Sequence, residues 1–174
     1  VENGRFNGFF LKNSMLYIRL SKNEKDIIYE ELCAQVERLL DNGILITHAD
    51  SHQHVHTALY LFPIVNRVLK RYSIDKLRIR KNINKNKWKM LYSNLFKIMY
   101  RMFGYKTVDY FENIRNYTTL EEGVSEIMVH PDFDNNVLID RYKYMENVPN
   151  GVELKKQFKS YLSSEIILTN YKEI

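Results

Sequence analysis

ILITHADSHQHVH, residues 44–56, is the stretch that decides how this chain folds. Its first part, residues 44–48, is short, largely β-branched and preceded by Gly43, a pattern typical of a buried strand. Its last nine residues, 48–56, contain Asp50 and four of the five histidines of the chain, namely His48, His52, His54 and His56. Imidazole binds divalent metals and transfers protons near neutral pH. We therefore expect a metal-assisted reaction at the carboxyl end of this strand.

Helical and extended patterns alternate on both sides of this stretch. The capping-box pair Ser21 and Glu24 predicts a helix over residues 22–41. Pro63 suits the first turn of a second helix that leads to Tyr72. The remaining predictions are strands at 76–80, 107–111, 124–129 and 165–169, and helices at 86–103 and 154–162. A strand, a helix and a strand in this order form a βαβ unit, so we expect an α/β fold with parallel strands.

The predicted helix 86–103 carries an apolar stripe at helical spacing, and Gly104 ends it. We assign this stripe to core or lid packing rather than to a cofactor site. Its members are Trp88, Leu91, Leu95, Ile98, Met99 and Met102.

The composition excludes several classes of protein. The 174 residues, 45% of them hydrophobic, predict a single domain over residues 1–174. The single cysteine, Cys33, excludes a disulfide framework and favours the cytoplasm. No apolar run approaches the roughly 20 residues that span a bilayer, so we expect no membrane partner. The net charge of +5 comes largely from a basic stretch at residues 76–89, which we interpret as a solvated face rather than a nucleic-acid site.

A further histidine, His130, follows the predicted strand 124–129. In parallel α/β folds, catalytic groups collect beyond the carboxyl ends of the strands. If the chain stays extended beyond residue 48, three side chains point to one side, those of His52, His54 and His56. One or two of them would bind a metal, and the others would contact the substrate or support the ligands. Asp50 then orients an imidazole or caps the loop. Arg80 either stabilises an oxyanion or substrate hydroxyl, or is an ordinary surface arginine.

These motifs resemble the YdjC-like carbohydrate deacetylases. The resemblance rests on residues 47–56, on Arg78-Ile79-Arg80 and on Glu126-Ile127-Met128-Val129-His130-Pro131. It extends to Gly4-Arg5-Phe6, to Glu31 with Gln35, to Asp109-Tyr110-Phe111 and to the closing Ile167-Leu168-Thr169-Asn170-Tyr171. It thus runs nearly from end to end.

The resemblance implies a distorted TIM-like (β/α) barrel that hydrolyses N-acetyl groups on amino sugars or oligosaccharides with a divalent metal. Magnesium is the expected metal and zinc the alternative. His52 would be a metal ligand, and His130 the catalytic proton donor to the leaving amine. Asp50, His54, His56 and Arg80 would bind the substrate or support the ligands.

The sequence also departs from the family pattern. An aspartate-rich motif and a Gly-Leu-His segment, which supply the other metal ligands in the family, are expected before residue 1. Asp132 stands where the family usually has glycine. We therefore expect the chain to correspond to the last two-thirds of such an enzyme, either as a fragment or as a truncated or inactive relative that dimerises or borrows its missing strands.

Two other functions fit the same residues. A metal-dependent phosphoesterase would use the histidines together with Arg80 and nearby lysines to hold phosphate. A non-catalytic sugar-binding or assembly module would keep the loop and bind carbohydrate without turnover.

Overall fold

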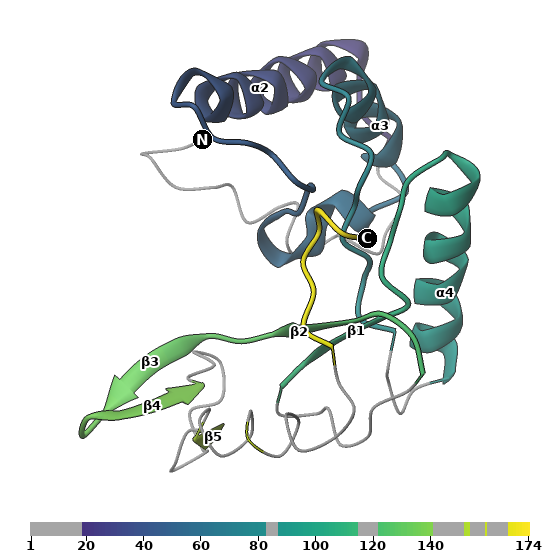
Figure 1. The fold of residues 1–174 in the computed structure, drawn as a ribbon. Coiled ribbons are helices and arrows are strands. Elements are labelled where there is room, and N and C mark those ends of the chain that lie inside the picture. Colours follow the sequence, from purple (N-terminus) through teal and green to yellow (C-terminus); the bar gives the residue numbers. More distant parts are fainter. Residues whose placement is uncertain (1–18, 83–86, 115–121, 141–151, 154–158, 160–166) are drawn as a thin grey trace. The chain divides into compact units, whose positions relative to one another are not determined.

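The computed structural model describes residues 19–82, 87–114, 122–140, 152–153, 159 and 167–174. The chain divides into two compact units, one made of residues 1–80 and 91–107 and the other of residues 81–90 and 108–174. The elements of the described residues, in chain order, are α2 (Lys22–Asp41), the 3-10 helix η1 (His52–Thr57), α3 (Phe62–Arg71), α4 (Lys87–Met102), β1 (Tyr110–Asn113), β2 (Ser125–Met128), β3 (Pro131–Asp134), β4 (Val137–Asp140) and β5 (Val152–Glu153) (Figure 1).

Helix α2 confirms the prediction from the capping box. The Ser21 hydroxyl accepts the backbone N–H of Glu24 at 3.3 Å, and the Glu24 carboxylate accepts the backbone N–H of Ser21 at 2.7 Å. At the other end Gly43 has φ +73, which lets the chain turn sharply out of the helix. The N–H of Ile44 then donates to the carbonyl of Leu39 at 3.0 Å, closing the last turn.

The predicted buried strand over residues 44–48 is wrong. The segment is irregular, and Leu45 is 73% exposed. The N–H of Ile44 is already used by the end of α2, and inter-segment backbone pairing begins only at Ala49. Among the described residues, this short β-branched run joins no sheet, and intrinsic preference alone does not make a strand.

Parallel pairing in this unit is confirmed, although it is limited to isolated bridges. Leu77 pairs with Ala49 on one side, and Lys76 pairs with Lys106 on the other. The predicted strand 76–80 is therefore shorter than expected. Its alternation is correct, because Leu77 and Ile79 are both fully buried.

Helix α3 begins as predicted around Pro63 and packs against α2 (Figure 1). Arg67 places its guanidinium 4.0 Å from the ring centroid of Tyr29 on α2. Beneath this pair lies a core cluster made of Leu20, Ala58, Tyr60, Leu61 and Ile64. The chain segment that leaves the histidine loop is thereby anchored in the core.

Helix α4 occupies the predicted position but faces the opposite way. Its buried side chains are Ser93, Phe96 and Tyr100, and Tyr100 stacks on Phe62 at 5.4 Å between ring centroids. The stripe assigned to core or lid packing is mostly exposed, from Trp88 at 80% to Met102 at 81%, with Leu91, Leu95 and Ile98 between them. The wider aromatic surface of Phe96 and Tyr100 takes the inner face, so the prediction for the stripe is wrong.

The second unit holds a parallel pair of strands and an antiparallel sheet. Strands β1 and β2 pair in parallel, with Asn113 opposite Met128. Strand β2 confirms the prediction at 124–129, whereas β1 begins three residues later than the prediction at 107–111 started. The Asn82 side-chain amide binds the chain at the start of β1, donating to the Asp109 carbonyl at 2.7 Å and accepting the Phe111 N–H at 2.9 Å.

The antiparallel sheet, in the order β3-β4-β5, was not predicted. Its tight turn at Asn135 and Asn136 has φ values of +46 and +63, a left-handed conformation that asparagine tolerates. The predicted helix 154–162 lies outside the described residues apart from Lys159. Of the predicted strand 165–169, residues 167–169 are described, and they are irregular.

The class is therefore α/β with parallel pairing, as predicted. The described residues form no closed barrel. Within the same residues, no helix has the length and apolar character needed to cross a membrane.

Candidate functional site

The histidine segment begins where parallel pairing holds the backbone. Ala49 donates to the Lys76 carbonyl at 2.9 Å, and its own carbonyl accepts the Arg78 N–H at 3.0 Å. The backbone of residues 75–77 bonds on its other side to Lys106. Asp50 and all residues of η1 thus follow the carboxyl end of a fixed parallel segment, which is where α/β folds usually place their sites.

The expectation that this segment stays extended is wrong. Ser51 is extended, but residues His52–Thr57 form the 3-10 helix η1, and His54 has φ +57. The Thr57 hydroxyl donates to the His54 carbonyl at 2.7 Å and stabilises this compact turn. With three residues per turn, His52, His54 and His56 point in different directions and have different environments.

His56 is the buried member of the segment, with 4% of its surface exposed. Its Nδ1 lies 2.6 Å from the Ser51 hydroxyl, and its Nε2 lies 2.8 Å from the Arg78 carbonyl. A carbonyl only accepts, so Nε2 carries the proton and the Ser51 hydroxyl donates to Nδ1. Burial lowers the pKa of His56 to about 4, although the bond to the Arg78 carbonyl opposes this shift. Both ring nitrogens are used by protein groups, so His56 supports the loop rather than binding a metal.

Asp50 forms an ion pair with Arg78. Its other carboxylate oxygen lies 3.8 Å from Nδ1 of His54. Burial, the largest single influence, raises the pKa of Asp50, but the His54 contact, the charge of Arg78 and further hydrogen bonds outweigh it and lower the pKa. Asp50 therefore acts as an anion that ties η1 to the segment bearing Arg78.

Among the histidines of the segment, His52 is the exposed one, and it begins η1. An exposed imidazole at this position fits a role as one ligand of a divalent metal, unlike the enclosed His56. A catalytic metal usually takes three protein ligands. The described residues contain no group of three His, Cys, Asp or Glu side chains arranged to hold an ion.

Arg80 lies in the same unit, two residues after Arg78. Its guanidinium reaches the Thr57 hydroxyl at 3.5 Å and lies 5.7 Å from the centroid of the Tyr92 ring. The side chain is half-buried, so its charge is held close to the end of η1. These two contacts hold the Arg80 guanidinium beside the end of η1.

His130 belongs to the second unit, where it follows the carboxyl end of β2 as predicted. Its Nδ1 lies 3.5 Å from a carboxylate oxygen of Asp140, and the same oxygen accepts the His130 backbone N–H. The structure therefore brings Asp50, His54, His56 and Arg80 into one unit with His52, and His130 stands in the other.

Three supporting residues escaped the sequence analysis as individuals. Ser51 and Arg78 hold His56 and Asp50, and Asp140 contacts His130. The first two lie inside the quoted motifs, where alternation around Leu77 and Ile79 could have marked Arg78 as directed away from the core. Asp140 had no local signal, because its contact depends on the unpredicted β3–β4 hairpin.

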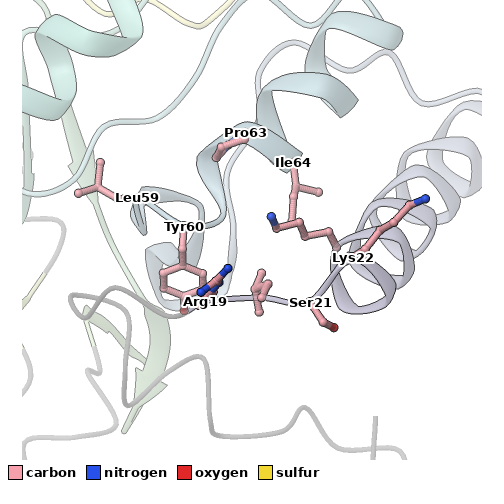
Figure 2. A pocket seen from close by; sticks show the side chains of 9 residues that line it. Arg19, Ser21, Lys22, Leu59, Tyr60, Pro63 and Ile64 are labelled. Atoms are coloured by element: carbon pink, nitrogen blue, oxygen red, sulfur yellow. The ribbon is translucent and has the colours of Figure 1, made fainter.

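A pocket of about 450 Å³ lies in the first unit between the start of α2 and the chain that follows η1 (Figure 2). Leu20, Tyr60 and Ile64 form its apolar wall. Three cationic side chains also line it, those of Arg19, Lys22 and Lys25. Such a lining favours ligands that carry negative charge.

Comparison with known proteins identifies relatives of the chain. Residues 1–166 match the family described as YdjC-like protein. A carbohydrate deacetylase of Listeria monocytogenes serotype 4b (strain CLIP80459) is 25% identical over 182 residues, covering 99% of this chain and 69% of that protein.

Two shorter matches are closer in sequence. A carbohydrate deacetylase of Geobacillus stearothermophilus is 47% identical over 53 residues, which are 30% of this chain and 22% of that protein. One of Vibrio campbellii (strain ATCC BAA-1116) is 41% identical over 51 residues, 29% of this chain and 20% of that protein. These two alignments span about a fifth of each relative. No solved structure matches the chain. The match over residues 1–166 shows that the chain belongs to the YdjC-like protein family.

Proposed function

We propose that this chain takes part in the metal-dependent removal of N-acetyl groups from amino sugars or oligosaccharides. The observation that carries the proposal is the difference in exposure between two histidines that follow a fixed parallel segment. His56 is buried, whereas His52 is exposed to solvent. Relatives named carbohydrate deacetylase give the reaction class.

His52 would bind a divalent metal, magnesium in the first instance and zinc as the alternative. When bound, the metal would polarise the acetamide carbonyl and the attacking water. The chain's own contribution is to hold His52 in place through η1, which the His56–Arg78 and Asp50–Arg78 contacts fix to residues 76–78. Asp50 and His54 would support the ligand or touch the substrate from this framework.

Two further residues would act on the substrate. His130 would protonate the nitrogen of the departing amine, a general-acid role that histidine performs near neutral pH. Arg80, whose position is set by Thr57 and Tyr92, would hold a sugar hydroxyl or the developing oxyanion.

The proposal includes the finer architecture expected from the resemblance. The parallel bridges and the β1–β2 pair would belong to a distorted TIM-like barrel in a single domain over residues 1–174. A homodimer would cover the apolar side chains exposed on α4. The lone cysteine supports a cytoplasmic location.

Acetate release tests this proposal. The purified chain, supplied with Mg²⁺ or Zn²⁺ in separate samples, is incubated with N-acetylated chito-oligosaccharides, and acetate is measured. We expect metal-dependent release that His130→Gln reduces by roughly 10²-fold or more, as loss of a general acid does. His48→Gln, a change in the same segment but outside the proposed site, is the matched control. Activity that His130→Gln leaves unchanged would remove His130 from the mechanism.

A metal-dependent phosphoesterase remains the second candidate, and the cationic pocket beside α2 favours it. This enzyme would hydrolyse a phosphate ester and be inhibited by inorganic phosphate. Hydrolysis of p-nitrophenyl phosphate without acetate release would establish this candidate and contradict the deacetylase.

A further inference from the structure

The β3–β4 hairpin returns the chain to the residue from which it started. His130 directly precedes β3, and Asp140 ends β4 opposite Pro131, the first residue of β3. The hairpin turns tightly through Asn135 and Asn136, both with positive φ. Such a short turn fixes the register of the two strands, so the position of Asp140 beside His130 is built into the fold.

The two side chains differ sharply in their exposure. The Asp140 side chain is completely buried, whereas that of His130 is 39% exposed. Burying a carboxylate is costly unless donors satisfy it, and the His130 backbone N–H is one such donor. The same Asp140 oxygen lies 3.5 Å from Nδ1 of His130. The buried Asp140 carboxylate therefore faces Nδ1 of the His130 ring.

We propose that Asp140 is the positioning residue of His130, holding the proton of the neutral ring on Nδ1 and leaving Nε2 as the atom that serves the substrate. An ionised carboxylate only accepts hydrogen bonds, so it favours the tautomer with a proton on the facing nitrogen. The separation of 3.5 Å is longer than a hydrogen bond, but catalytic hydrogen bonds are often long without substrate and shorten when it binds.

This inference rests on the general-acid role proposed for His130 and gives that role its geometry. The doubly protonated ring would transfer the Nε2 proton to the amine nitrogen as the C–N bond breaks. The neutral ring that remains carries its proton on Nδ1, next to Asp140. The Asp140 carboxylate thus favours the neutral tautomer of His130 that remains after the proton has been transferred.

Nuclear magnetic resonance tests the inference without any need for turnover. Long-range ¹H–¹⁵N spectra of the ¹⁵N-labelled 174-residue chain, recorded at a pH at which the imidazoles are neutral, report the tautomer of each ring. His130→Gln assigns the His130 signals. We expect the Nδ1–H tautomer in the unaltered chain. A predominant Nε2–H tautomer there would overturn the inference, whether or not the Asp140 variants fold.

Three variants sharpen the test. Asp140→Asn should move most of the His130 population to the Nε2–H tautomer, and Asp140→Glu should restore part of the Nδ1–H form. Asp132→Asn, on the same hairpin but exposed, should change nothing, since the Asp132 carboxylate accepts the Phe133 N–H. A tautomer unaffected by Asp140→Asn would overturn the inference.

Activity gives the functional side of the same test. In the acetate-release assay Asp140→Asn should lower kcat by at least about 10-fold with KM nearly unchanged, because orientation of the acid matters in the transition state. Asp140→Glu should recover part of kcat. Absence of acetate release from the unaltered chain would count against the proposed function alone, because the tautomer is read independently.

Discussion

Nε2 of His56 lies 2.8 Å from the carbonyl oxygen of Arg78, joining the histidine segment to the neighbouring parallel segment. The bond requires a proton on Nε2, and the Ser51 hydroxyl occupies the opposite nitrogen at 2.6 Å. A doubly protonated ring would lose the hydrogen bond that the Ser51 hydroxyl donates to Nδ1, and it would put a positive charge in a buried position. The neutral ring is therefore part of the folded structure.

Stability should consequently fall in mild acid. The pKa of His56 is about 4 in the folded chain against 6.5 for an ordinary histidine, so between these values the unfolded chain binds the extra proton. The contribution of the neutral His56 ring to the free energy of unfolding is fully present above pH 6.5. It is lost as the pH falls toward about 4, and the loss is roughly 3 kcal/mol at most. Urea unfolding across this range, compared with His56→Gln, measures it.

His56→Gln should show a shallower loss of stability with falling pH and lower stability at neutral pH. His48→Gln is the control for removing a histidine from the same segment. Equal pH dependence in the unaltered chain and His56→Gln would show that His56 titrates normally, against its enclosed position.

The Asp50–Arg78 pair should couple energetically, because both side chains are largely removed from solvent. Their exposed fractions are 30% and 20%. A double-mutant cycle with Asp50→Asn and Arg78→Gln, measured by urea unfolding, should give a coupling free energy of about 1–2 kcal/mol, above the usual value for exposed pairs.

The Arg71–Glu37 pair supplies the comparison for this cycle. Its nitrogen and oxygen are 3.5 Å apart, and both side chains are about half exposed. We expect a coupling below about 0.5 kcal/mol there. Equal coupling in the two pairs would contradict the view that Asp50 and Arg78 fix η1 to its neighbouring segment.

Charged substitutions on the exposed face of α4 should weaken the proposed homodimer. Leu95→Glu with Ile98→Glu places two carboxylates among apolar side chains, so a homodimer that buries this face should dissociate. Light scattering coupled to size-exclusion chromatography measures the mass. Met90→Glu adds charge on another side of the helix and should leave the mass unchanged. A monomer before mutation would exclude the dimer.

Local signals in the sequence predicted the positions of α2, α3 and α4. The capping box at Ser21 and the glycine at position 43 predicted the ends of α2, because each acts on backbone groups within a few residues. The strand at 44–48 and the buried face of α4 were wrong, since both depend on what the rest of the chain offers as a partner. Phe62, distant in sequence, stacks on Tyr100 and helps determine which side of α4 is buried.

The sequence predicted which residues belong to the candidate site, but not how their side chains are arranged. Clustering identified His52, His54 and His56, but only the 3-10 helix separates an enclosed His56 from an exposed His52. The assignment of metal and substrate roles remains a prediction. The contact of Asp140 with His130 could not be predicted, because it depends on a hairpin, β3–β4, that the sequence pattern did not predict.

The most direct test of the central claim is titration of the chain with Mn²⁺, a stand-in for Mg²⁺, with free ion followed by electron paramagnetic resonance. We expect His52→Ala to weaken binding by more than about 10-fold, because removing a ligand costs at least as much as removing its support. His56→Gln should weaken binding less than His52→Ala. Equal Mn²⁺ affinity in the unaltered chain and His52→Ala would contradict the account, since the exposed histidine would then have no part in a metal site.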